Sequence, residues 1–223
     1  MLFDDWAARY DAWFETPAGQ AVRRYEAELV KELLQPRAGE TLLDAGCGTG
    51  VFTQDFLAAG AAVTGLDISA PMLDVARKKT GGLPFFGVRG DMLHLPFLDG
   101  SFDKAVSVTA LEFIGDARRA VDELFRVTRR GGRVVVATLN SLSSWADRRR
   151  STPPDDEQDV WQNAIFRPPD GLLALSPYSG VVRTAIHFEQ DADPDRIDAI
   201  EERGKLRGLM TGAFVAARWE KPA

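Results

Sequence analysis

The sequence has few of the residues that build disulfide frameworks and metal centres. Its 223 residues include one cysteine, Cys47, and two histidines. A single cysteine excludes an internal disulfide, and with only two histidines beside it no zinc site can be argued. We therefore expect no bound metal, and the cysteine usage is consistent with a reducing compartment.

Long apolar runs and a basic surplus are also missing. No segment approaches the roughly 18 apolar residues that cross a bilayer, and residues 1–6 lack the basic-then-apolar pattern of a signal peptide. We expect a cytoplasmic protein with no membrane span. The net charge is −6, and the short basic run at residues 148–150 is followed by acids at 155–157. Because phosphate neutralisation needs basic residues, this balance argues against a nucleic-acid partner.

What is present is an alternation of strand and helix patterns. Hydrophobic residues make up 45% of the chain, which allows a sizeable core. Helical patterns over 49–59, 70–79 and 117–128 separate apolar strands at 41–45, 61–66, 84–89, 101–109 and 133–138. Such alternation predicts an α/β fold, a three-layer sandwich in which helices cover both faces of a mostly parallel sheet. Ligands of such sheets bind beyond the carboxyl ends of the strands.

The ends of the chain follow other patterns. Residues 3–14 carry an aromatic stripe at helical spacing, and 18–34 form an amphipathic helix. Gly131 and Gly132 are expected to end the helix that Asp116 caps. Beyond residue 140 we expect a helix within 141–150, an irregular Pro-rich and acidic stretch over 151–170, a charged helix within 191–208, and strands at 181–189 and 211–219.

The turn after the first strand reads Asp44-Ala45-Gly46-Cys47-Gly48-Thr49-Gly50. Its alternating glycines let a ligand approach the main chain, and the helix that follows offers free N–H groups to a carboxylate. A dinucleotide fingerprint needs glycine or alanine at the third position counted from Gly46, where this chain has Val51. The spacing therefore argues against a nicotinamide dinucleotide.

Two acidic residues follow at later strand ends. Asp67, 21 positions after Gly46, can accept hydrogen bonds from both hydroxyls of a ribose. Asp91 can accept from an adenine amino group, and Met92 can cover the ring. Each residue taken alone fits an ordinary loop or core position equally well.

The ordered motifs Leu-Asp-Ala-Gly-Cys-Gly-Thr-Gly, Gly-Leu-Asp-Ile-Ser, Gly-Asp-Met-x-x-Leu-Pro-Phe and Ser-Phe-Asp-x-Ala-Val resemble the class I S-adenosylmethionine (SAM)-dependent methyltransferases. The similarity is greatest to the small-molecule branch that includes the ubiquinone and menaquinone biosynthesis enzymes. It implies a Rossmann-like, seven-stranded sheet with an antiparallel last strand. It also implies one domain over 1–223, with an N-terminal helical lid (1–35), a cofactor-binding core (40–140), a variable insertion (141–180) and the final strands (181–223).

The resemblance also implies roles for single residues. Asp44 and the loop from Gly46 to Gly50 would hold the methionine part of SAM, Asp67 the ribose, and Thr109 would lie near the sulfonium. Tyr10 belongs to a Tyr-Asp pair resembling one in the family's lid. The full expected cofactor set is Tyr10, Asp44, Gly46, Cys47, Gly48, Gly50, Asp67, Ile68, Met72, Asp91, Met92 and Thr109, with SAM bound before transfer and S-adenosylhomocysteine after it.

The acceptor side is less defined. Glu112 stands where ubiquinone-type relatives often carry histidine, and it could be a base, an acceptor ligand or a solvated loop acid. Trp13, Phe113 and Trp145 could line an acceptor pocket, as could Trp161, although helix and core packing explain the tryptophans equally well. The expected partner is a small-molecule acceptor, with the chain a monomer or homodimer. An NAD-type oxidoreductase and a non-catalytic SAM-binding regulatory module are the alternatives.

Overall fold

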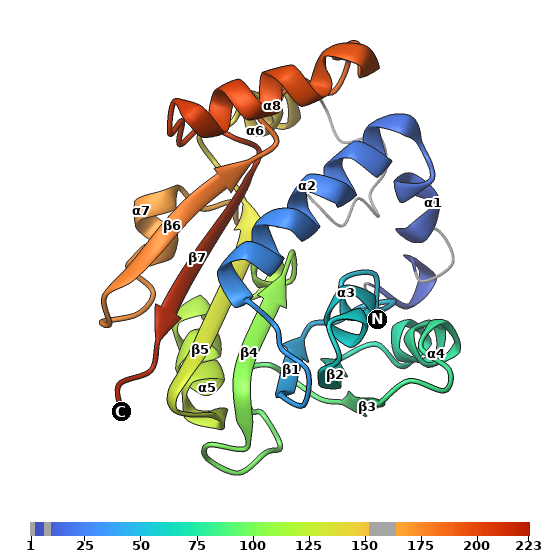
Figure 1. The fold of residues 1–223 in the computed structure, drawn as a ribbon, viewed down its shortest axis with the longest axis vertical. Helices are drawn as coiled ribbons and strands as arrows, with labels where there is room; N and C mark the ends of the chain where they lie inside the picture. Colours follow the sequence, from blue (N-terminus) through green and yellow to red (C-terminus); the bar gives the residue numbers. More distant parts are fainter. Residues whose placement is uncertain (1–2, 7–9, 152–163) are drawn as a thin grey trace.

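The structure is a computed structural model that describes residues 3–6, 10–151 and 164–223. Its described residues form a seven-stranded sheet in the order β3-β2-β1-β4-β5-β7-β6 (Figure 1). The four pairings from β3 to β5 are parallel, and β7 runs antiparallel to both β5 and β6. This confirms the predicted fold. The strands are β1 (Thr41–Ala45), β2 (Ala62–Asp67), β3 (Phe85–Arg89), β4 (Phe102–Val108), β5 (Thr128–Leu139), β6 (Gly180–Ala185) and β7 (Phe214–Glu220).

Helices lie on both faces of this sheet (Figure 1). The 3₁₀ turns are η1 (Asp4–Trp6), η2 (Leu111–Phe113) and η3 (Pro194–Arg196). The α-helices are α1 (Tyr10–Phe14), α2 (Pro17–Leu34), α3 (Thr53–Ala58), α4 (Ala70–Lys79), α5 (Ala117–Val127), α6 (Ser144–Ser151), α7 (Pro169–Leu173) and α8 (Ile197–Leu206). None of the helices in these ranges has both the length and the apolar character to cross a membrane.

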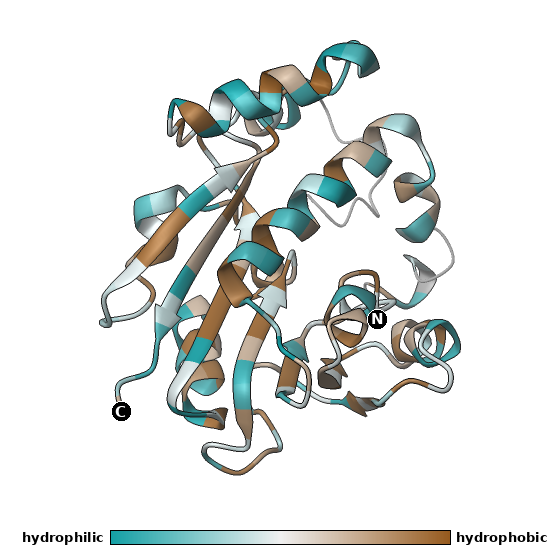
Figure 2. Cartoon of the chain, viewed as in Figure 1, coloured by the Kyte–Doolittle hydropathy of each residue, from teal (hydrophilic) through white to brown (hydrophobic). Residues whose placement is uncertain are grey.

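The central strands consist largely of apolar residues, which are brown in Figure 2, and these residues belong to two core clusters. Alternate residues of one strand point to opposite faces. Leu42 therefore joins the core beneath α2, whereas Leu43 joins the core beneath α5. This two-sided burial is the physical reason that the strands read as continuous apolar runs rather than alternating ones.

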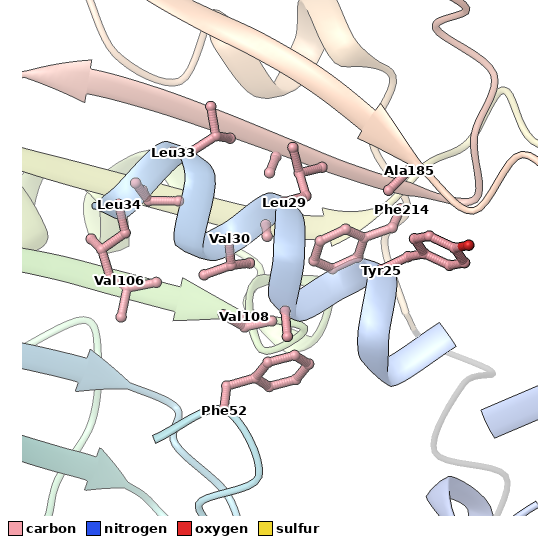
Figure 3. Packing of buried hydrophobic residues seen from close by; sticks show 14 of the residues in the cluster. Tyr25, Leu29, Val30, Leu33, Leu34, Phe52, Val106, Val108, Ala185 and Phe214 are labelled. Carbon is pink, nitrogen blue, oxygen red and sulfur yellow. The ribbon is translucent and has the colours of Figure 1, made fainter. Parts of the chain in front are cut away.

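The long helix α2 covers one face of the sheet beside the site. The Thr16 hydroxyl caps it by accepting from the Gly19 N–H at 3.0 Å. Leu29, Val30 and Leu33 then point from α2 onto β4, β5 and β7 (Figure 3). The amphipathic pattern predicted over 18–34 is confirmed.

Two predicted boundaries are wrong near Gly131 and Gly132. Helix α5 ends at Val127, where the Thr128 hydroxyl donates to the Leu124 carbonyl at 2.7 Å. The two glycines instead lie within β5, at a register shift between its pairings with Phe102 and with Lys104 of β4. The glycine pair therefore marks an irregular strand rather than a helix end.

Within the aromatic stripe over 3–14, the described residues form η1 and α1. Two other segments are shorter than predicted. Helix α3 begins at Thr53 because residues 49–52 belong to the glycine turn. Strand β6 stops at Ala185 because Ile186 takes a left-handed φ of 65°. Buried Glu201 of α8 accepts from the N–H groups of Ile186 and His187 and holds this bend.

Candidate active site

A cavity of about 350 Å³ opens beyond the carboxyl ends of β1, β2 and β4. In the strand order, β2 lies on one side of β1 and β4 lies on the other. The cavity lies at this switch point, which is the usual ligand position in such sheets. The predicted residues that line it are Tyr10, Asp44, Gly46, Cys47, Gly48, Asp67, Ile68, Met72, Asp91, Met92, Thr109 and Phe113. Segments far apart in the sequence thus meet at one site.

The glycine turn forms the floor of this cavity. The N–H groups of Gly46 and Cys47 both donate to the Leu66 carbonyl, at 2.7 and 3.0 Å, which ties the turn to the end of β2. Gly46 has a φ of +77°, and a Cβ there would overlap the Ala110 Cβ and lie 3.3 Å from Met92 Cε. Gly50 does not line the cavity but packs against Ala76 of α4. The turn is therefore shaped by close packing on both sides.

Asp67, at the end of β2, faces both the glycine turn and the start of α4. Its Oδ2 accepts from the Gly48 N–H at 2.8 Å, and its Oδ1 accepts from the Ser69 N–H at 2.9 Å. A carboxylate oxygen has two lone pairs, so each of the two can accept a second hydrogen bond. Burial raises the pKa of Asp67, and the two N–H donors oppose that rise. The carboxylate is thus held in place with acceptor capacity remaining toward the cavity.

Asp44 is a buried acid on the cavity wall. The Thr53 hydroxyl donates to its Oδ2 at 2.6 Å, and no described group donates to its Oδ1. Burial raises the pKa of Asp44 to about 7, and the nearby Asp67 charge adds to the rise. An incoming ammonium group would restore the charged form by pairing with it.

This pKa predicts that binding of S-adenosylhomocysteine depends on pH through its ammonium group. Because the Asp44 carboxyl is protonated below pH 7, the ammonium loses its partner as the pH falls. We expect the affinity to drop about tenfold between pH 8 and pH 6, measured by calorimetry. Asp44→Asn should bind more weakly and lose this pH dependence. A wild-type affinity that is equal at the two pH values would contradict the assignment.

The N-terminal segment lies across the mouth of the cavity. The Phe3 ring meets the Phe113 ring edge to face, with centroids 4.8 Å apart. Asp11 accepts from the Thr49 hydroxyl at 2.7 Å and pairs with Lys79 Nζ at 2.5 Å. These contacts join the segment to the glycine turn and to α4, and its role as a lid stays a prediction.

Tyr10 reaches into the cavity from this segment. Its side chain lines the cavity together with Thr109, which follows β4, and burial raises the Tyr10 pKa above its usual value. Thr109 itself takes a left-handed φ of 47°. Strained residues of this kind collect at functional sites.

Glu112 lies behind the cavity wall rather than on it. It is fully buried in η2, and its Oε1 accepts from the Leu139 N–H at 2.8 Å. Burial raises its pKa to about 7, although the charge of Arg167 partly offsets this. A solvated loop acid is therefore wrong as a description of Glu112, while a role as base or acceptor ligand stays a prediction.

The predicted tryptophans lie away from the cavity lining. Trp13 is 44% exposed at the end of α1. Trp145 packs on the Phe188 ring and donates from Nε1 to the Phe188 carbonyl at 2.8 Å. Trp161 falls outside the described residues. Their acceptor-binding role stays a prediction that no cavity contact supports.

The cavity also contains residues that the sequence analysis did not select. Phe3, Trp6, Phe52, Val108, Ala110 and Ile114 line it as well and add apolar surface. Phe3 and Trp6 belong to the aromatic stripe of the predicted lid, but they were not named as site residues. Across the described ranges, no group of three or more His, Cys, Asp and Glu side chains is arranged to hold a metal ion.

Fold and cavity together define a Rossmann-like protein with a cavity at the switch point of its sheet, where such folds bind their ligands. A methyltransferase-domain family model matches residues 43–136. The malonyl-[acyl-carrier protein] O-methyltransferase of Erwinia pyrifoliae is 36% identical over 199 residues, covering 76% of this chain and 75% of that protein. The chain therefore belongs to the SAM-dependent methyltransferase family.

Two other proteins show how far the similarity extends. The demethylmenaquinone methyltransferase of Paenarthrobacter aurescens is 33% identical over 139 residues, which cover 62% of this chain but only 54% of that protein. A Thermotoga maritima structure described as a SAM-dependent methyltransferase, possible histamine N-methyltransferase, covers 99% of this chain and 98% of its own, with a TM-score of 0.76 and 23% identity. The second likeness concerns the fold alone.

Proposed function

We propose that this protein transfers a methyl group from SAM to a small-molecule acceptor in the cytoplasm. The observation that carries this proposal is the convergence of the glycine turn, Asp44 and Asp67 on one cavity with apolar walls. Its volume of about 350 Å³ lies in the range of small-molecule sites. The demethylmenaquinone in the name of one relative supports a small acceptor, whereas the name of the other gives a malonyl group on an acyl-carrier protein.

The residues present fit SAM. Asp44 offers a carboxylate oxygen that no described donor uses, as an ammonium group requires. Asp67 offers further acceptor capacity to the ribose hydroxyls, and Ile68 and Met92 present apolar surface to the adenine. Bound SAM supplies a methyl group on a positively charged sulfur. The chain contributes binding, orientation and exclusion of water.

Positioning accounts for much of the expected rate gain, because an in-line displacement needs the acceptor atom aligned with the methyl. Thr109 and Tyr10 line the cavity together at the end of β4. Phe3 and Phe113 close the same region with an aromatic contact. The N-terminal segment therefore both shields the site and shapes the space left for the acceptor.

The test is calorimetry followed by turnover. S-adenosylhomocysteine should bind saturably to the wild-type chain, and NADH at the same concentration should give no heat. The opposite pattern would favour an oxidoreductase and overturn the proposal. A chain that binds S-adenosylhomocysteine but releases none from SAM with any acceptor of a broad small-molecule panel would instead be a binding module.

A further inference from the structure

The charged side chains of the cavity lining lie along three neighbouring strands. Asp91 follows β3, Asp67 ends β2, and Asp44 lies in β1 one residue before its end. All three are acids, and no lysine, arginine or histidine is among the described residues of the lining. These acids are the expected partners of the adenine, the ribose and the ammonium group of SAM. Bound cofactor would therefore engage every charged group that the described lining presents.

The lining beside β4 is apolar. Residues 108–110 and 113–115 end and follow this strand, and the Thr109 hydroxyl is the one polar side-chain group among them. Phe3 joins this wall through its contact with the Phe113 ring, and Trp6 and Tyr10 extend it. Burial raises the pKa of Tyr10, so its hydroxyl stays uncharged. The part of the lining that the three acids leave to the acceptor thus offers aromatic surface, two hydroxyls and no charge.

Four arginines contact residues of the lining without being part of it. Each donates to the main-chain carbonyl of a lining residue, and none of the four lines the cavity itself. The pairs are Arg23 with Val51, Arg89 with Ile68, Arg119 with Leu93 and Arg167 with Ile114, at 2.6, 3.1, 3.1 and 3.5 Å. Arg23 also lies over the Phe52 ring and pairs with Asp55. These guanidinium groups support the main chain of the wall rather than present charge to the cavity.

Two further basic side chains near the site are also engaged outside the cavity. Lys79 Nζ pairs with Asp11 at 2.5 Å and donates to the Thr49 hydroxyl at 3.1 Å. The side chain of His94 is 70% exposed, with its Nδ1 3.9 Å from an Asp91 oxygen. Neither lines the cavity. A carboxylate or phosphate on the acceptor would therefore be buried against this wall without a counter-ion, which is strongly unfavourable.

We propose that the methyl acceptor binds as an uncharged molecule with a largely apolar, ring-containing body. This inference rests on the proposed methyltransferase function. A neutral ring gains contact with Phe3, Trp6 and Phe113 and leaves no buried charge unpaired. The Tyr10 and Thr109 hydroxyls can each donate and accept, which suits one hydroxyl or carbonyl group on the acceptor. An ammonium group would instead face the positively charged sulfur of SAM, with no lining acid left to pair with it.

The experiment measures binding to the wild-type chain saturated with S-adenosylhomocysteine, by calorimetry at pH 8. Three probes share a phenyl ring and a two-carbon side chain: 2-phenylethanol, phenylacetate and 2-phenylethylamine. We expect the neutral alcohol to bind about tenfold or more tightly than either charged probe, because each charge would be buried unpaired. The whole chain is used, so the stretches outside the described ranges, in which Arg9 has the one basic side chain, take part in the measurement.

Three variants test the wall itself. Ile114→Lys places a cation in the lining and should reverse the order, so that phenylacetate binds more tightly than 2-phenylethanol. Leu206→Lys is the matched control, because Leu206 is 81% exposed on α8 and does not line the cavity. It should leave the order unchanged. Phe113→Ala removes part of the aromatic surface and should weaken binding of the alcohol about fivefold or more.

Each other result overturns the proposal. A charged probe bound as tightly as the alcohol, no binding of the alcohol, or an unchanged order in a folded Ile114→Lys chain would do so. Thermal unfolding checks the variants, and if Ile114→Lys does not fold, an unchanged affinity of Phe113→Ala for the alcohol overturns the proposal in its place. Binding of S-adenosylhomocysteine is recorded first in the same cell, so its absence counts against the methyltransferase function rather than against the acceptor class.

Discussion

Replacing Asp67 with alanine should raise the Kd for S-adenosylhomocysteine about 100-fold or more. Two ribose hydroxyls would donate to one carboxylate, and a hydrogen bond to a charged group contributes roughly 1.5–3 kcal/mol. The same carboxylate holds the N–H groups of Gly48 and Ser69, so its loss also releases the glycine turn from α4. Both effects weaken binding, and calorimetry at pH 8 measures their sum.

Two variants separate these contributions. Asp67→Asn keeps one acceptor oxygen without the charge and should recover part of the affinity. Asp74→Ala removes an exposed acid of α4 that pairs with Arg77, so it should leave the Kd unchanged. A Kd for Asp67→Ala within threefold of the wild-type value would show that Asp67 does not hold the ribose.

Gly46→Ala should destabilise the fold as well as the site. A left-handed backbone costs an L-residue roughly 1–2 kcal/mol, and forcing an extra carbon into a packed core costs about 1–3 kcal/mol more. The new Cβ would overlap the Ala110 Cβ, so both costs apply. We expect a Tm lower by about 5–15 °C, measured by calorimetric melting, and loss of S-adenosylhomocysteine binding.

The chain supplies matched controls for this substitution. Gly39 has a φ of +80° with open space around a Cβ, so Gly39→Ala carries the backbone cost alone. The double variant Gly46→Ala with Ala110→Gly removes the overlapping carbon. It should recover the part of the Tm loss that the overlap causes. Equal losses of Tm for Gly46→Ala and Gly39→Ala would show that the contact with Ala110 is unimportant.

The core of the fold could be predicted because its signals are local. The strand from Thr41 is a short apolar run, and the glycines after it mark a turn whatever surrounds them. The helix end predicted at Gly131 and Gly132 was wrong for the opposite reason. A glycine pair ends many helices, and only the pairing of β5 with β4 shows that here it lies inside an irregular strand.

The site could be predicted where residues follow strand ends, as Asp44 and Asp67 do. Phe3 and Trp6 were predicted only as members of the lid stripe, because helical spacing does not show which side chains of the stripe reach the cavity. The burial of Glu26, which does not line the cavity, was missed because acids in an amphipathic helix usually face solvent. Its four-residue spacing from Val22 and Val30 was the available signal that it points inward.

The position of β7 has a consequence for how the sheet is completed. β6 pairs only with β7 among the described strands, and β7 follows it by about 30 residues along the chain. During folding, β6 therefore gains its ladder only in the step in which the later strand β7 pairs with it. Trp219, fully buried on β7, is placed to report that step by its fluorescence.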